Sequence, residues 1–339
     1  MKRLFWINLI LFISIGFLAS PAFGVVFKIA SLSPEGSEWM QEMRAGAQEI
    51  ALKTENRVKF KFYPGGIMGN DKAVLRKIRV GQLHGGAVTG GSLVKIYPDL
   101  NLYSLPMKFR SLDEIDYIRK HMDALIISGL EKKGFVAFGL AEAGFAYVMS
   151  KAPVKTTQDL RNQKVWMPGQ ALTTAEVMQD LGIKPIPLPV ADVRTGLQTG
   201  LIDAVTISPI GAIVLQWHTR IHYLTDTPLA YIYAMLAVDR RQFEKMSAED
   251  QAVVREIMGG VFASINKKNR QDNVEALKVL RKHGIQLVKP DAATEKQWHE
   301  VAAAVTGRAI EAGHLSPSMV ELLENHLRDF RSQGSNSDG

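Results

Sequence analysis

The chain has 339 residues, 46% of them hydrophobic, which is enough for two domains with sizeable cores. It contains no cysteine, and this excludes disulfides, thiolate catalysis and cysteine-based metal sites. The net charge of +7 is spread along the chain without a basic run, so a solvated basic surface is favoured over a nucleic-acid-binding arm.

Residues 1–24 predict a secretory signal peptide. A basic start at Lys2 and Arg3 precedes an almost wholly apolar run over residues 4–18, and the small residues Ala22 and Gly24 then precede a cleavage site before Val25. A membrane anchor is the alternative, but the apolar run is shorter than the ~20 residues that a span needs. No cysteine follows the site, which excludes lipid attachment. We therefore expect an exported, soluble, periplasmic protein that is not lipidated.

The first part of the mature chain alternates strands and helices. Period and turn residues predict strands at 25–30, 58–62 and 85–89 and helices at 37–54 and 70–83. This order implies a mainly parallel sheet with right-handed crossovers.

The remainder of the chain continues the α/β pattern and then becomes helical. Strands are predicted at 135–140, 145–149, 164–167, 204–207, 229–238 and 285–288, with residues 141–144 as a link between the first two. Helices are predicted at 112–130, 171–181, 190–199, 209–217, 247–283, 294–312 and 316–330, followed by a flexible polar tail at 332–339.

Four phrases resemble the solute receptors of tripartite ATP-independent periplasmic (TRAP) transporters, the DctP-like family. They are YPGGIMGND (63–71), IYPDLNLYSLP (96–106), DLRNQKVWMPG (159–169) and VRTGLQTGLIDA (193–204). Their order and spacing fit the family, and the resemblance covers residues 25 to about 331.

The resemblance implies an α/β fold of the two-lobed periplasmic binding protein type (type II-like), with a cleft between the lobes and long C-terminal helices. Lobe I is expected to comprise 25–142 and 234–273, and lobe II 143–233 and 274–331. The lobes are expected to close over a small-molecule ligand and then to dock on the small and large TRAP membrane subunits.

The expected ligand site departs from the family pattern. In the family, an arginine of the "iRvP" strand pairs bidentately with a ligand carboxylate, and this chain has Trp166 there. A second position that is often arginine aligns with Phe145. Polar or charged cleft positions align with Thr89 and Ser92, and a further polar position with Ser208.

Two more residues complete the candidate ligand site. Trp39 is an aromatic residue of the first helix, and Arg194 stands where the family's helix usually has tyrosine. Arg194 is either a displaced cation for the ligand or a surface arginine. Aromatic lining without a carboxylate clamp predicts an apolar, aromatic or lipid-like ligand.

No catalytic or metal constellation is present in the sequence. His218 and His222 have a spacing that could ligate zinc on a helix, but no glutamate completes a zincin motif and Arg220 lies between them, so a solvated helix end is favoured. No phosphate-binding glycine loop or hydrolase elbow occurs. We expect neither a catalytic activity nor a cofactor.

The function that we expect is therefore that of a TRAP solute receptor. The alternative is a periplasmic carrier or sensor module that passes an apolar ligand to another periplasmic protein. Enzyme activity is the weakest reading. The identity of the ligand, the oligomeric state, the coupling ion and the cognate permease stay open.

Overall fold

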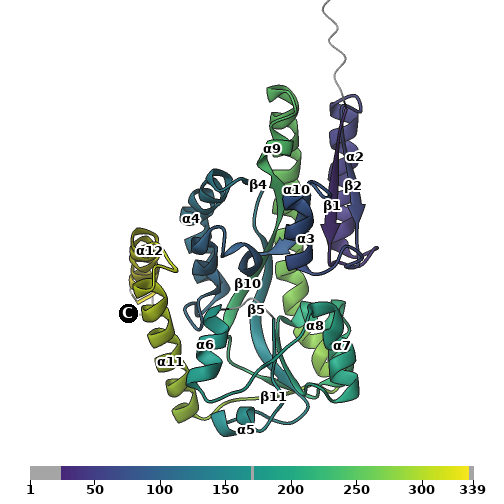
Figure 1. Cartoon of the computed structure of the whole chain (residues 1–339). Helices are drawn as coiled ribbons and strands as arrows, with labels where there is room; N and C mark the ends of the chain where they lie inside the picture. Colours follow the sequence, from purple (N-terminus) through teal and green to yellow (C-terminus); the bar gives the residue numbers. More distant parts are fainter. Residues whose placement is uncertain (1–23, 169–171, 336–339) are drawn as a thin grey trace, which may run out of the picture.

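The computed structural model describes residues 24–168 and 172–335, which form a mixed α/β fold around one large sheet (Figure 1). Within these residues the sheet has nine strands, in the order β11-β9-β5-β10-β3-β1-β2, with β4 paired to β10 and β8 paired to β5. The short strands β6 (Trp166–Met167) and β7 (Ile186–Pro187) pair separately.

The first section of the sheet is built from parallel strands. β1 (Val25–Ser31) pairs with β2 (Val58–Tyr63) on one side and with β3 (Gly85–Thr89) on the other. The connecting helices are α2 (Glu38–Lys53) and α3 (Asp71–Arg79), and each begins after a side-chain cap, Ser37 and Asn70 respectively. The predicted strand–helix alternation is thus correct here, although α3 ends at Arg79 and not at residue 83.

Two ten-residue strands join this section to a second one. β10 (Ala230–Asp239) pairs antiparallel with β3 and with β4 (Phe135–Ala137) near its end, and with β5 (Ala141–Ser150) near its start. β5 then continues beyond β10. A movement of one section against the other must therefore be accommodated where β5 and β10 pass from one section to the other.

The second section lies beyond this crossing. β5 pairs antiparallel with β8 (Ala204–Ile207) and β9 (Tyr223–Thr225), and β9 pairs in parallel with β11 (Gln286–Val288). The helices around this section are α5 (Thr157–Arg161), α6 (Leu172–Asp180), α7 (Val190–Thr199), α8 (Pro209–Val214) and the 3₁₀ turn η3 (Trp217–Arg220).

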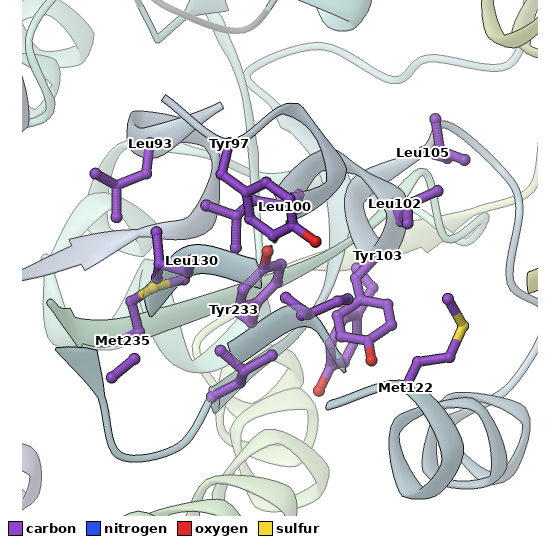
Figure 2. Close-up of a cluster of buried hydrophobic side chains, with 14 of the residues drawn as sticks. Leu93, Tyr97, Leu100, Leu102, Tyr103, Leu105, Met122, Leu130, Tyr233 and Met235 are labelled. Carbon is purple, nitrogen blue, oxygen red and sulfur yellow. Dashed lines mark hydrogen bonds between the residues drawn. The ribbon is translucent and has the colours of Figure 1, made fainter. Parts of the chain in front are cut away.

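The largest hydrophobic cluster lies beside the first section. The short helices η1 (Gly90–Leu93) and η2 (Pro98–Ser104) and the helix α4 (Leu112–Lys132) enclose it against β10. Figure 2 shows its centre, where the rings of Tyr103 and Tyr233 meet edge to face with centroids 5.6 Å apart. This cluster fixes the end of β3 and the segment that follows it, which carry the predicted site residues Thr89 and Ser92.

Long helices complete the fold. After the short helix α9 (Arg240–Phe243), α10 (Ala248–Lys282) packs on α2, β5 and α8, so it touches both sections of the sheet. α11 (Ala292–Glu311) packs on α6, and α12 (Pro317–Ser335) packs on α4 at the side of the molecule in Figure 1.

Two predictions about the strands are wrong. Residues 141–144 are not a link, because they form the first part of β5. Their mixed sequence resembles a break, yet Glu142 is buried and its charge is paired by Arg270. The sheet is also mixed and not mainly parallel, since β5 and β10 run antiparallel to each other and to their other neighbours β3, β4, β8 and β9.

The predicted lobe boundaries stay a prediction, and one contact bears on them. The boundaries place residues 274–331 in lobe II, but α12 packs on α4, which belongs to the predicted lobe I. Arg331 reinforces this contact, because its Nε donates to Glu114 at the start of α4 over 2.6 Å.

No helix within the described residues has the length and apolar character needed to cross a membrane. The predicted signal peptide lies outside those residues except for Gly24. The predicted tail lies outside them from residue 336 on, whereas residues 332–335 are the last residues of α12 and not a flexible tail.

Candidate functional site

The first part of the candidate site lies where the parallel strands β1 and β3 end at one edge of the sheet, the usual place for a ligand crevice. Thr89 ends β3, and Ser92 lies in η1. Their hydroxyl oxygens are 2.7 Å apart. Oδ2 of Asp71 accepts hydrogen bonds from both hydroxyls and from the Thr89 N–H, at 3.0 Å from Thr89 Oγ1 and 3.2 Å from Thr89 N. The structure therefore brings these two predicted residues together around a carboxylate.

Sequence reasoning missed the part played by Asp71. The residue begins α3 directly after the cap Asn70, so in the sequence it looks like an ordinary acidic first-turn residue. No local pattern indicates that this helix start meets the end of β3. The meeting depends on the crossover that returns the chain from β2 through α3 to β3.

The backbone at this edge of the sheet is closely packed against the side chain of Tyr233. A Cβ atom on Gly90 would lie 2.3 Å from Cζ of Tyr233, so a glycine is required after Thr89. Phe145, on β5, is 8% exposed and contacts Tyr231 edge to face at 5.9 Å. Phe145 and Tyr233 belong to the cluster of Figure 2. Phe145 thus packs in the hydrophobic cluster beside the first section.

Trp166 occupies the core of the second section. It is 5% exposed, and its ring meets Trp217 edge to face at 5.2 Å. Its Nε1–H donates to the carbonyl oxygen of Leu188 over 2.9 Å. The side chain therefore offers neither a cation nor a free hydrogen-bond donor to a ligand.

Ser208 caps the short helix α8. Its Oγ accepts from the Gly211 N–H at 3.3 Å, and Oδ1 of Asn273, on α10, accepts from the Ile210 N–H at 3.3 Å. Pro209 has no N–H. The first-turn donors of α8 are therefore already used within the protein.

Trp39 and Arg194 occupy different environments. Trp39 meets Phe262 edge to face at 5.6 Å, and its buried indole N–H has no partner among the described residues. Arg194 is exposed on α7 and makes no hydrogen bond or ion pair with any other described residue. Trp39, Phe145 and Trp166 pack in three separate hydrophobic clusters. Their assignment to one ligand site stays a prediction.

A charged network surrounds the buried Glu142 where α10 packs on β5. Glu142 is 1% exposed, and its carboxylate accepts from Nε of Arg270 at 2.8 Å and from the Tyr231 hydroxyl at 3.1 Å. Arg270 also donates to Asp116, at 2.7 and 2.8 Å. Its hydrogen bonds to the carboxylates of Glu142 and Asp116 raise the pKa of Arg270 above its usual value, so this cation stays charged. The network borders a polar pocket of about 420 Å³ between α4 and α10, which Arg119 also lines.

Of the two histidines considered for zinc, His218 has other side-chain contacts. Nδ1 of His218 lies 3.1 Å from the carbonyl oxygen of Ala212, and its ring lies beside that of His283. Among the described residues, no group of three or more histidine, aspartate or glutamate side chains is arranged to hold a metal ion.

Two sheet sections joined by two crossing strands, with a long helix touching both, form the architecture of a two-lobed binding protein. The chain belongs to the bacterial extracellular solute-binding proteins, family 7, whose model matches residues 29–312. This family comprises the periplasmic receptors of TRAP importers, as the four sequence phrases indicated.

Curated relatives agree with this assignment. The 2,3-diketo-L-gulonate-binding periplasmic protein YiaO of Escherichia coli is 28% identical over 244 residues, which are 66% of this chain and 72% of that protein. The protein YiiZ of Salmonella typhimurium is 25% identical over 210 residues, or 61% of this chain, and the match spans 64% of its length.

Solved structures establish the fold. A TRAP periplasmic solute-binding protein of Sulfitobacter sp. NAS-14.1 with bound β-D-galacturonate has a TM-score of 0.79 and 21% identity, covering 90% of this chain and 99% of that one. A solute receptor of Bordetella pertussis that binds pyroglutamic acid has a TM-score of 0.81 and 18% identity, covering 90% and 100%.

Proposed function

We propose that this protein is a TRAP receptor for a small organic ligand without a carboxylate, with an apolar or aromatic surface. The ligand is captured by closure of the two lobes and delivered to the small and large membrane subunits of the permease. The observation that carries the proposal is the environment of Trp166. By the resemblance of residues 159–169 to the family, this indole, which is buried and bonded to Leu188, aligns with the carboxylate-clamping arginine.

Charge at the first part of the site supports the same ligand class. Asp71 places a carboxylate beside Thr89 and Ser92, and the described contacts give it hydroxyl and N–H donors but no cation. An anionic ligand bound there would be repelled, and a desolvated charge without a partner costs several kcal/mol. The α8 end of the site adds no compensating donor, because Asn273 and Ser208 already accept its first N–H groups.

The relatives define the competing ligand class. Their names and titles give galacturonate, pyroglutamic acid and 2,3-diketo-L-gulonate, which are all acids or their anions. If the present chain retains this class, the cation must come from outside the family's arginine position. Arg194 is the candidate, because it is exposed and has no partner among the described residues.

Calorimetry against a panel of acids and uncharged compounds tests the proposal. We expect no binding of D-galacturonate, D-glucuronate, L-gulonate or pyroglutamate at millimolar concentration. We expect binding of an apolar or aromatic compound, identified first by native mass spectrometry of what co-purifies. Micromolar binding of any of the acids to the unmodified protein would contradict the proposal. Its loss in Arg194→Ala, but not in the exposed control Lys278→Ala, would then identify Arg194 as a displaced clamp.

Export is a separate prediction. We expect the mature chain to begin at Val25 and to be released from cells by osmotic shock, because residues 1–24 have every part of a signal peptide. N-terminal sequencing of the released protein checks the cleavage site. Retention of Met1 on a membrane-bound protein would show that the segment is an anchor.

A further inference from the structure

The crossing strand β5 has a bulge between the two sheet sections. In the pairing of β5 with β10, Gly144 lies opposite Ile232 and Glu142 lies opposite Tyr233, so Ala143 has no partner residue on β10. Gly144 has a φ of +88°, a left-handed conformation that glycine adopts without strain. Bulges bend a strand and leave one residue's backbone groups unpaired. The backbone of residues 142–144 therefore needs partners from outside the sheet.

Three asparagines of α10 supply these partners. Asn266, Asn269 and Asn273 are three and four residues apart, so they share one face of the helix. Asn266 accepts from the Glu142 N–H at 2.6 Å and donates to the Leu140 carbonyl at 2.8 Å. Asn269 donates to the Glu142 carbonyl, and Asn273 donates to the Ala143 carbonyl at 3.2 Å. These three side chains thus hold α10 against residues 140–143 by hydrogen bonds.

Asn273 differs from the other two because it also reaches the second section. It is 7% exposed, and while its Nδ2 donates to Ala143 its Oδ1 accepts from the Ile210 N–H in the first turn of α8. A Cβ atom on Gly144 would lie 2.7 Å from Nδ2 of Asn273, so the amide is packed directly against the bulge. One side chain thus touches the strand bulge, the long helix and the start of α8.

We propose that Asn273 is a positioning residue for the ligand site. Its amide sets the distance between the bulge of β5 and the start of α8, whose cap Ser208 is a predicted site residue. Asn266 and Asn269 hold the long helix to residues 140–142, and the second section pivots at Ala143 and Gly144. The Asn273 contact then limits how far α8 moves from the first section. This inference concerns the movement of the receptor and holds for any class of ligand.

The experiment needs no ligand, so its failure and the failure of the proposed ligand class are distinguishable. The chain has no cysteine, so Leu52→Cys on α2 and Leu201→Cys after α7 provide the sole sites for spin labels. Both leucines are well exposed, at 77% and 49%. In this background we expect Asn273→Ala to broaden the distribution of distances between the labels. We also expect the Ile210 amide to exchange with solvent about tenfold faster, the factor for one lost hydrogen bond.

Two further variants separate positioning from general stability. Asn266→Ala removes contacts to residues 140 and 142, so we expect a lower melting temperature with an unchanged distance distribution and unchanged exchange at Ile210. Asn273→Asp keeps the acceptor for Ile210 but loses the donor to Ala143, so exchange at Ile210 should stay slow while the distances broaden. If Asn273→Ala does not fold, the Asn273→Asp variant still tests the proposal. Equal broadening in Asn266→Ala, or no broadening in either Asn273 variant, would overturn the proposal.

Discussion

Replacing Arg270 by methionine is expected to lower the free energy of unfolding by about 3–5 kcal/mol, the scale for removing one partner of a buried ion pair. Glu142 is 1% exposed, and Arg270 is the cation that bonds it. Methionine keeps the apolar stem but leaves this carboxylate buried without its ion-pair partner. The Tyr231 hydroxyl alone does not compensate for it. Urea denaturation followed by circular dichroism measures the change.

A double-mutant cycle shows whether the unpaired charge is the cause. Adding Glu142→Gln to Arg270→Met removes the stranded carboxylate, so the double variant should regain part of the lost stability. Lys278→Ala is the matched control, because its ion pair with Glu275 lies on the same helix and is largely exposed, and its effect should stay within about 1 kcal/mol. Equal losses in the single and double variants would mean that packing of the arginine, and not charge pairing, dominates.

Replacing Trp166 by alanine is expected to cost about 3–5 kcal/mol of unfolding free energy, because it removes a large aromatic side chain from a packed core. The indole contacts Trp217 and donates to the Leu188 carbonyl, and both interactions are lost. Thermal and urea denaturation give the size of the loss. Arg194→Ala serves as the control, since that exposed side chain bonds to no other described residue and its loss should be close to neutral.

This expectation also affects how ligand binding to Trp166 variants is interpreted. A weaker affinity in Trp166→Ala has meaning only at a temperature where the variant is folded. Trp166→Phe retains an aromatic ring in the same cluster and is the better variant for calorimetry. A stability loss below about 1 kcal/mol in Trp166→Ala would show that the side chain lies in a collapsible or solvent-filled space and not in a packed core.

Much of the fold could be predicted from the sequence, because local signals and tertiary structure agree over most of the chain. The caps Ser37, Asn70 and Ser247 mark helix starts in both. The failure at residues 141–144 has a physical reason. The segment is held by Arg270 and the asparagines of α10, more than a hundred residues later, and no local period records such partners.

The candidate site was predictable only in part. Thr89 and Ser92 could be aligned with family positions, and the structure brings them together. Asp71, which joins them, looks in the sequence like an acidic residue at a helix start. Trp166 could be recognised as a departure from the family, but the sequence does not show that its indole N–H is already bonded to Leu188. Side-chain partners of this kind are decided by tertiary packing.

The position of the last helix has a consequence for how the protein folds. α12 closes the cluster around α4 through contacts between residues that are very distant in the chain: the Ser316 N–H donates to Asp99, and Arg331 bonds Glu114, each across 217 residues. Contacts at such sequence separation have a high loop-closure entropy and slow the search for the native state. The cluster around α4, although it lies early in the chain, is therefore completed only when the last helix packs on it. A chain shortened before Ser316 would leave the buried carboxylates of Asp99 and Glu114 without these donors and expose the apolar face of α4 to aggregation.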